Sequence, residues 1–105
     1  MVTAYELIEE IRKNGGKVKR GVNETTKAIE RGTAKLVFYA KDTNPKEIIQ
    51  HLPLLCEEKG IKCIEVDSKE KLGIAAGLNV AAASIAIIDY GNAQNLVEEF
   101  LKEIK

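Results

Sequence analysis

The sequence has little of what most enzymes depend on. It contains one histidine, two cysteines and no formal net charge, and its glycines form neither GxGxxG nor GxxxxGK[ST]. The single histidine, His51, lies inside the helical pattern "IIQHLPLLC", where a structural histidine is far more common than a catalytic one. We therefore expect no catalytic residue, no metal site and no cofactor.

The cysteine spacing and the hydrophobic runs exclude further classes of protein. Cys56 and Cys63 lack the CxxC spacing of redox and zinc sites. No export signal follows Met1, and no apolar run approaches the length that crosses a bilayer. We expect a cytoplasmic protein without a membrane partner, with reduced, buried thiols rather than a disulfide.

Only two prolines interrupt a chain that is 45% hydrophobic and 30% charged. This composition is typical of a folded domain rather than of a disordered or low-complexity segment. Because 105 residues allow one core but not two, residues 1–105 are expected to form a single domain.

Hydrophobic periodicity predicts five helices that alternate with four strands. The strands are expected at residues 17–21, 35–40, 62–66 and 81–89. The third helix should bend or split at Pro53, and its expected apolar face consists of Ile48, Ile49, Leu52, Leu55 and Cys56. The helices are expected to begin or end at Thr3, residues 14–16, Asn23, Gly32, Pro45, Gly60, Ser68 and Asn92.

This alternation of helices and strands indicates an α/β protein. We expect a three-layer α/β/α sandwich with a four-stranded mixed sheet. Parallel pairing is expected to predominate, although the short first strand could run antiparallel.

The charges are unevenly distributed along the chain. Residues 12–35 carry eight cationic and two acidic side chains, a net charge of plus six, and the remainder carries minus six. The zero total gives no support to a general RNA-binding protein. The basic segment is either a local anion-binding surface or an uneven solvated one.

Within the basic segment, "GVNETTKAIERG" (residues 21–32) predicts a helix with an amide, a carboxylate and two cations along one side. With Asn23 as its cap, Glu24, Lys27 and Arg31 follow one face, while apolar residues face the core. Helix N-termini attract phosphate, and amide, carboxylate and ammonium groups together can read guanine edges. The alternative is that Asn23 only caps the helix and that Glu24 and Lys27 form an ordinary surface pair.

A second feature is the apolar stretch "GLNVAAAS" (residues 77–84), between a helix that should end near Gly77 and the last strand. Leu78 and Val80 could then lie on an exposed loop, where unstacked RNA bases would pack against them. The alternative is one long buried strand.

Together these segments resemble a known family. "KRGVNETTKAIERGTAKLVFYAKDTNP", "HLPLLCEEKGI", "SKEKLG" and "AAGLNVAAASIAII" closely resemble archaeal ribosomal proteins of the L7Ae type, over nearly the whole chain. The resemblance implies the same sandwich fold and no enzymatic activity. It also implies binding to the kink-turn, a helix–bulge–helix RNA element with tandem sheared G·A pairs and a flipped-out base.

The resemblance implies roles for individual residues. A G-x-N-E-x-x-K motif would contact the guanines of the G·A pairs, an apolar loop would cover the bulge, and a third set would hold the flipped base. Family members usually have an acidic residue in place of Asn44, and often Glu in place of Lys41. The implied RNA-binding residues are Lys19, Arg20, Gly21, Asn23, Glu24, Lys27 and Arg31 in the motif and beside it, Asn44, Ile48 and Lys69 in the base pocket, and Leu78, Asn79, Val80 and Ala81 in the loop.

By the same resemblance, the RNA partners would be ribosomal RNA of the large subunit, box C/D and box H/ACA guide RNAs and, in some members, RNase P RNA, together with other ribonucleoprotein core proteins. The protein would trap the kinked form of the RNA and would be a monomer when free. Two other hypotheses are a ribosome-restricted structural protein of the L30e type and a small enzyme that uses Cys56 or His51.

Overall fold

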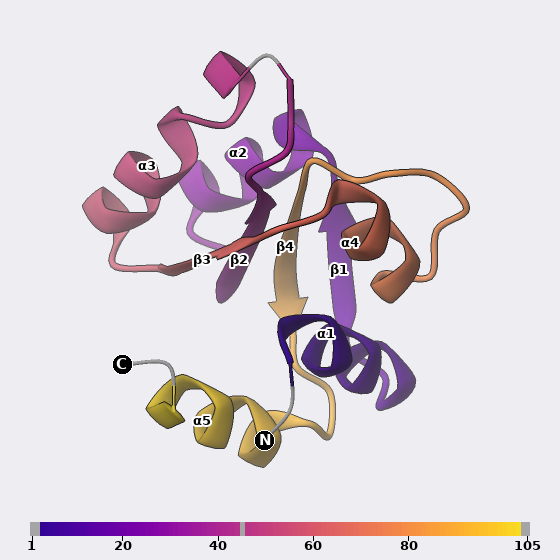
Figure 1. Ribbon diagram of the computed structural model, residues 1–105. Helices are drawn as coiled ribbons and strands as arrows, with labels where there is room; N and C mark the ends of the chain where they lie inside the picture. The colour runs from indigo at the N-terminus through magenta and orange to yellow at the C-terminus, as the bar shows by residue number, and fades with distance from the viewer. Residues whose placement is uncertain (1–2, 45, 104–105) are drawn as a thin grey trace.

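The computed structural model describes residues 3–44 and 46–103, which form five α-helices around a four-stranded sheet. Figure 1 shows α2 and α3 on one face of the sheet and α1, α4 and α5 on the other, so the α/β/α sandwich is confirmed. In chain order the elements are α1 (Ala4–Lys13), β1 (Lys17–Arg20), α2 (Val22–Arg31), β2 (Leu36–Ala40), the 3₁₀ turn η1 (Lys46–Ile48), α3 (His51–Lys59), β3 (Lys62–Val66), α4 (Lys69–Ala75), β4 (Ser84–Asp89) and α5 (Gln94–Glu103).

The strand polarity decides which connections meet in space. The strand order is β1-β4-β2-β3; β2 pairs in parallel with β3, whereas β4 pairs antiparallel with both β1 and β2. The expectation that parallel pairs predominate is therefore wrong, and the antiparallel first strand is confirmed. As a result, the C-terminal ends of β1, β2 and β3 lie at the same edge of the sheet as the N-terminal end of β4.

The direction of β4 has a local cause. The helix before it, α4, has only seven residues, a rise of about 10 Å. The Ala82 N–H then donates to the Lys69 carbonyl at 3.0 Å, so the chain that leaves α4 returns to the start of this helix. Because β4 begins at the edge that β3 has just reached, it must run the opposite way. It starts at Ser84, not at residue 81 as expected.

Side-chain caps begin two of the helices at the expected residues. The Thr3 hydroxyl accepts from the Glu6 N–H at 3.1 Å, and the Glu6 carboxylate accepts from the Thr3 N–H at 3.3 Å, a complete capping box for α1. The Ser68 hydroxyl accepts from the Lys71 N–H at 3.2 Å at the start of α4. The last helix, α5, begins two residues after Asn92, its expected first position.

The expected third helix is split, but the break lies at residues 49–50, before Pro53, and α3 continues through the proline. The 3₁₀ turn ends at Ile48 and α3 begins at His51. Pro53 therefore occupies the third position of α3, where the missing N–H removes no helical hydrogen bond. The expected start of the helix at Pro45 lies outside the described residues.

The apolar face of this region is formed as expected except at its beginning. Ile49, Leu52 and Cys56 are buried, and Leu55 is half-buried. Ile48 is instead 41% exposed, because it belongs to the 3₁₀ turn and not to α3. It is therefore available at the surface rather than part of the core.

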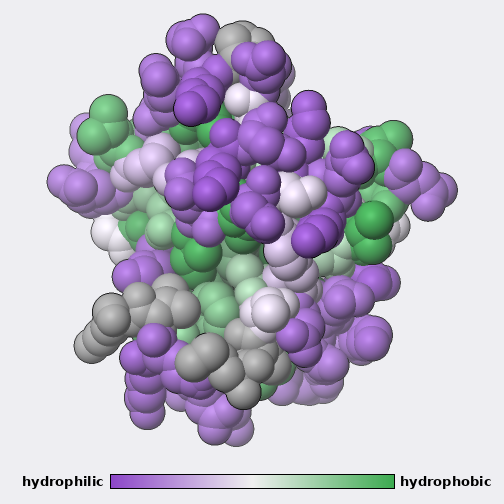
Figure 2. Space-filling model, in the orientation of Figure 1, coloured by the Kyte–Doolittle hydropathy of each residue, from purple (hydrophilic) through white to green (hydrophobic). Residues whose placement is uncertain are grey.

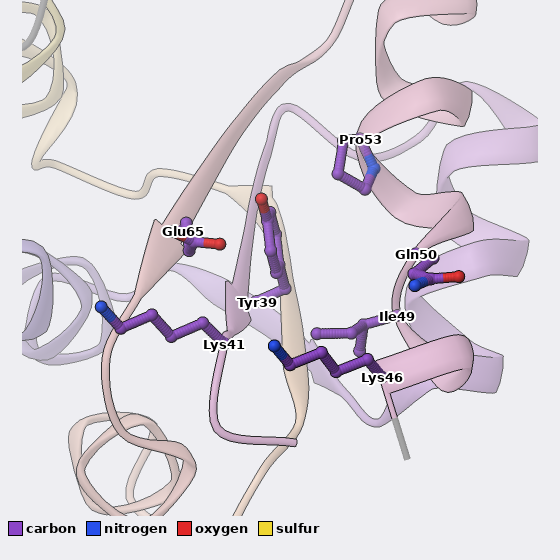
Figure 3. Close-up of a pocket in the computed structure, with 7 residues that line it drawn as sticks. All are labelled: Tyr39, Lys41, Lys46, Ile49, Gln50, Pro53 and Glu65. Atoms are coloured by element: carbon purple, nitrogen blue, oxygen red, sulfur yellow. The ribbon is translucent and has the colours of Figure 1, made fainter. Parts of the chain in front are cut away.

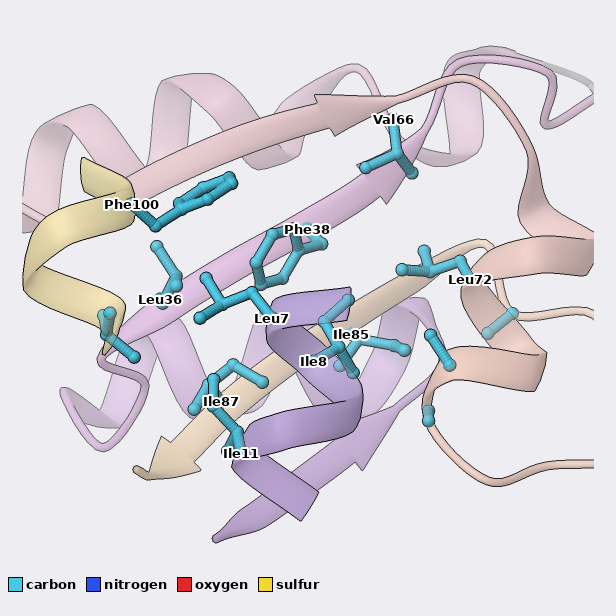
Figure 4. Close-up of a cluster of buried hydrophobic side chains, with 14 of the residues drawn as sticks. Leu7, Ile8, Ile11, Leu36, Phe38, Val66, Leu72, Ile85, Ile87 and Phe100 are labelled. Carbon is cyan, nitrogen blue, oxygen red and sulfur yellow. The ribbon is translucent and has the colours of Figure 1, made fainter. Parts of the chain in front are cut away.

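Two apolar cores lie on the two faces of the sheet. Phe38 of β2 is fully buried in the larger core, among side chains of α1, α4 and α5 (Figure 4). Its neighbour Val37 points to the opposite face and packs in the smaller core, beneath α2 and α3. This alternation follows from the two-residue period of a strand, so residues 37, 39 and 41 share the α3 face.

The start of α4 is also tied to α1. The Tyr5 hydroxyl donates to the Asp67 carboxylate and accepts from the Ser68 N–H at 3.0 Å. The hydrogen bond from Tyr5 holds the pKa of Asp67 below its ordinary value, and burial raises the pKa of Tyr5. An ionised Asp67 and a protonated Tyr5 therefore hold the start of α4 in place at neutral pH.

The start of α2 is held by a buried polar contact. The Ser84 hydroxyl donates to the Thr25 hydroxyl oxygen at 3.0 Å, and both side chains are fully buried between α2 and β4. Because a buried hydroxyl without a partner is unfavourable, this pair makes the two elements depend on each other.

We expect Thr25→Val to lower the free energy of unfolding by about 1–3 kcal/mol, since it leaves the Ser84 hydroxyl without its acceptor. The double variant Thr25→Val/Ser84→Ala should recover part of this loss, because neither hydroxyl then remains buried and unpaired. Urea unfolding of Thr25→Val, Ser84→Ala and the double variant measures the coupling. Strictly additive losses would show that the two hydroxyls do not depend on each other.

Candidate nucleic-acid interface

One edge of the sheet gathers the segments singled out by the sequence. Here β1 leads into α2, β3 leads into α4, and residues 76–83 lead into β4. The Gly21 N–H donates to the Ser84 carbonyl at 2.9 Å, and the Lys69 N–H donates to the Asp42 carboxylate at 2.9 Å. These hydrogen bonds join the starts of α2 and α4 to the loops beside them.

The first turn of α2 differs from the prediction in its cap. The N-cap is Gly21, with φ of 90°, a backbone conformation that favours glycine. Asn23 is the second residue of the helix, and no side chain caps it. The prediction that Asn23 is the cap is therefore wrong. Its exposed amide is not used to begin the helix.

The polar face of α2 is arranged as its spacing predicted. Glu24, Lys27 and Arg31 are exposed, while Ala28 and Ile29 are buried against the sheet. The Lys27 Nζ lies 3.8 Å from a Glu24 carboxylate oxygen, and both side chains are more than half exposed, 55% and 53%. The surface pair of Glu24 and Lys27, which the sequence indicated as part of the alternative, does form. Such a pair contributes only about 0–1 kcal/mol to stability. An incoming ligand can therefore replace it.

Three hollows follow one another from α2 to α4. The central hollow, about 540 Å³, shares Lys19 and Glu24 with one neighbour and Ala81 with the other. A neighbour of about 220 Å³ lies along α2, and one of about 330 Å³ lies beside the loop before β4. The central hollow is lined by Val18, Lys19, Arg20, Gly21, Glu24, Ala81, Ala82 and Ala83, the α2 hollow by Lys19, Glu24, Lys27, Ala28, Arg31, Thr33 and Ile88, and the loop hollow by Glu70, Ile74, Leu78, Asn79, Val80 and Ala81. The basic and apolar segments thus form one continuous surface.

The stretch before β4 is a loop rather than part of a long buried strand. Leu78 packs partly against the larger core, and Val80 is 56% exposed. Apolar side chains gather over this loop and α4 at the right of Figure 2, beside polar ones. Ile74 of α4, which is 67% exposed, belongs to this apolar patch and was missed from the sequence. The sequence pattern that could have revealed it is the position of this isoleucine on the face of α4 opposite the buried Leu72.

The residues implied for a flipped-base pocket come from two connections near the same edge. Asn44 and Ile48 are exposed, and Lys69 is half-buried at the start of α4. The backbone bond from Lys69 to Asp42 places α4 beside the segment that carries Asn44. The three hollows just described are lined by none of these residues, so the base pocket stays a prediction.

The two cysteines and the histidine contact other residues within the fold. Cys56 is buried, Cys63 is half-buried, and neither forms a disulfide. The hydrogen bond to Cys56, together with burial, raises the pKa of the Cys63 thiol, so this thiol stays protonated at neutral pH. The His51 Nε2 lies 2.8 Å from the Thr26 hydroxyl, a contact that joins α3 to α2.

Comparison with known proteins identifies the class to which this fold and surface belong. Residues 3–97 match the model of the ribosomal protein L7Ae/L30e/S12e/Gadd45 family, and the chain belongs to this family. It is similar in structure to the Giardia lamblia 15.5kD RNA binding protein, with a TM-score of 0.85 and 35% sequence identity; the match covers 94% of this chain and 82% of that chain. The resemblance to the L7Ae type is thereby confirmed. Every helix in the described part of the chain is too short or too polar to cross a bilayer.

The position of the loop depends on one buried glycine. Gly73 lies in α4, and a Cβ atom there would come within 2.0 Å of the Val80 carbonyl oxygen. The Leu78 N–H also donates to the Gly73 carbonyl at 2.9 Å. The helix and the loop therefore approach each other more closely than any larger residue allows.

We expect Gly73→Ala to lower the free energy of unfolding by about 1–3 kcal/mol, because the added methyl must displace the Val80 backbone. In a helix without such a contact, the same substitution would stabilise by about 1 kcal/mol, so the sign of the change is decisive. Urea unfolding measures it, and amide NMR shifts of residues 78–83 report the displaced loop. Ile74→Ala, on the exposed side of the same helix, is the control and should change stability by less than about 0.5 kcal/mol.

Proposed function

We infer that this protein binds kink-turn RNA and stabilises its sharply bent form. The observation that carries the proposal is the continuous surface that joins the Glu24 and Lys27 side of α2 to the apolar loop before β4, with Asn23 exposed in the same first turn. Membership of a family that includes ribosomal proteins, and similarity to a protein named as RNA binding, support RNA as the partner.

The chemistry of α2 suits sheared G·A pairs. A carboxylate accepts hydrogen bonds from the N–H groups of guanine, and amide and ammonium groups address its O6 and N7 atoms. Glu24 would accept from the base edge, with Asn23 and Lys27 on either side of the same turn. Lys19, Arg20 and Arg31 would line the path of the phosphates, where their charge offsets the repulsion between backbones at the kink, and Gly21 would let the RNA approach the backbone closely.

The loop would recognise the bulge by packing. Leu78, Asn79, Val80 and Ala81 offer a mainly apolar surface on which unstacked bases can lie, and Asn44, Ile48 and Lys69 would hold the flipped base. No bond is made or broken. The protein acts because it binds the bent conformer in preference to the extended one, which shifts the RNA equilibrium.

This activity would serve ribonucleoprotein assembly in the cytoplasm. We propose the large ribosomal subunit and the box C/D and box H/ACA guide particles as its settings, with RNase P as a further one, and a free monomer of one RNA-binding domain. Reconstitution of a methylation-competent box C/D particle with its other core proteins tests this breadth. A ribosome-restricted protein of the L30e type would bind its RNA but fail to assemble that particle.

The deciding experiment is a titration with a short kink-turn RNA and with the same RNA in which Watson–Crick pairs replace the G·A pairs, at two salt concentrations. Tight binding to the kink-turn alone supports the proposal. Equal binding to both RNAs that falls steeply with salt would identify a general phosphate-binding surface and overturn it.

We expect Asn23→Ala and Glu24→Ala each to weaken binding to the kink-turn by about 1–3 kcal/mol, the scale of one good base contact. For Glu24→Ala the direction of the change in RNA affinity is informative. If binding depended on phosphate attraction alone, the loss of a negative charge should strengthen it. Glu30→Ala removes the same charge from an exposed position of the same helix, more than one turn further from its N-terminal end, and is the matched control. Unchanged affinity in both test variants would refute base reading by α2.

A further inference from the structure

A separate hollow of about 250 Å³ lies on the α3 side of the sheet, and the proposed RNA surface does not include it. One of its walls comes from the strands. Tyr39 of β2 and Glu65 of β3 are direct partners in the parallel register, and Lys41 follows two residues later on the same face. The chain topology, rather than any local motif, brings these three side chains together.

The opposite wall comes from η1 and the first turn of α3. Ile49 is buried and Pro53 is half-buried, so both present fixed apolar surface. Figure 3 shows the Tyr39 ring on the strand side of the hollow, with Ile49, Gln50 and Pro53 on the helix side. A slot between an aromatic ring and apolar side chains is suited to a flat ring, because stacking buries both faces of such a ligand.

The entrance to this slot is cationic. Lys41 and Lys46 both line the hollow, and the Lys46 side chain reaches from η1 toward Tyr39 (Figure 3). In the described part of the chain neither lining lysine forms an ion pair with a carboxylate, although the charge of Lys41 adds to the Tyr5 hydrogen bond in lowering the pKa of Asp67. Figure 3 shows the Lys41 ammonium extending away from Lys46 on the strand side, so a phosphate drawn to these two exposed lysines requires the flexible Lys41 side chain to turn toward the slot.

The remaining polar groups provide hydrogen bonds inside the slot. Gln50 occupies the N-cap position of α3 but makes no capping bond with its side chain, so its amide can reach a ligand. Burial, and then the charge of Glu65, raise the pKa of Tyr39, which keeps its hydroxyl protonated. The Glu65 carboxylate can only accept, so it favours a ring edge that donates, such as the N1–H and 2-amino groups of guanine.

We propose that this hollow is a nucleotide-binding site that takes a base with N–H donors, stacked on Tyr39, with the phosphate at Lys41 and Lys46. The nucleotide could be free, or it could be a single-stranded residue of an RNA. The site does not depend on the proposed kink-turn function, because it shares no lining residue with the three hollows of that surface.

The test is an NMR titration of the ¹⁵N-labelled full chain with GMP, UMP and inorganic phosphate. GMP is expected to shift the amides of Tyr39, Lys41, Lys46, Gln50 and Glu65, and to bind more tightly than UMP, which offers a single N–H donor. Equal affinity for inorganic phosphate at the same amides would identify a general anion site and overturn the proposal. So would GMP-dependent shifts confined to α2 and the loop before β4, or no shifts at all.

Substitutions assign the binding to individual groups. Lys41→Gln/Lys46→Gln should weaken GMP binding by about tenfold or more, and the effect should shrink at high salt. Lys59→Gln/Lys62→Gln, two exposed lysines of α3 and β3 outside the hollow, is the matched control and should leave the affinity unchanged. Glu65→Gln should narrow the preference for GMP over UMP, and equal losses in the two lysine pairs would refute the assignment.

A second arm separates the two sources of the nucleotide. A kink-turn RNA is compared with the same RNA carrying a single-stranded guanosine-containing tail. If the tail tightens binding to the unmodified chain but not to Lys41→Gln/Lys46→Gln, an RNA residue occupies the site. If GMP binds while the tail has no effect, the site takes free nucleotide. If GMP does not bind and the tail does not tighten binding, the proposed nucleotide site is overturned, even if the protein still binds the kink-turn RNA.

Discussion

The direction of β4 is the constraint on which the candidate interface depends. If β4 ran parallel to β2, the loop before it would lie at the far edge of the sheet, away from the start of α2. Instead, the short α4 and the bond from Ala82 back to Lys69 return the chain to the edge that β3 has reached. The basic turn after β1 and the apolar loop before β4 thereby become neighbours.

The two halves of this surface are held with different stiffness. The α2 side is anchored by a buried Ser84–Thr25 hydrogen bond and by Ile29 in the smaller core, so the helix backbone that carries its polar groups has a fixed position. The loop side is held by backbone hydrogen bonds and by Leu78, while Val80 remains exposed. A rigid helix suits hydrogen bonds to base edges, which need defined geometry, whereas apolar packing tolerates small adjustments.

Local sequence signals predicted those features that depend on a few neighbouring residues. Thr3 and Ser68 begin their helices because a short side chain can satisfy nearby N–H groups, and Pro53 prevented one continuous third helix. The prediction for Asn23 failed because Asn is by itself a preferred capping residue, while the residue two positions earlier is the one that begins the helix. Gly21 takes the cap because its N–H must also pair with Ser84, a contact made across 63 residues that the local sequence does not reveal.

The sequence by itself determined the layers of this protein and the polar face of α2, because both follow from periodic patterns of apolar residues over single helices and strands. Only the tertiary structure decided which side chains share a surface. The slot between Tyr39, Glu65 and Pro53, and the meeting of the basic turn after β1 with the apolar loop before β4, depend on strand register and on where loops return. These are contacts between distant segments, and no local period in the chain encodes them.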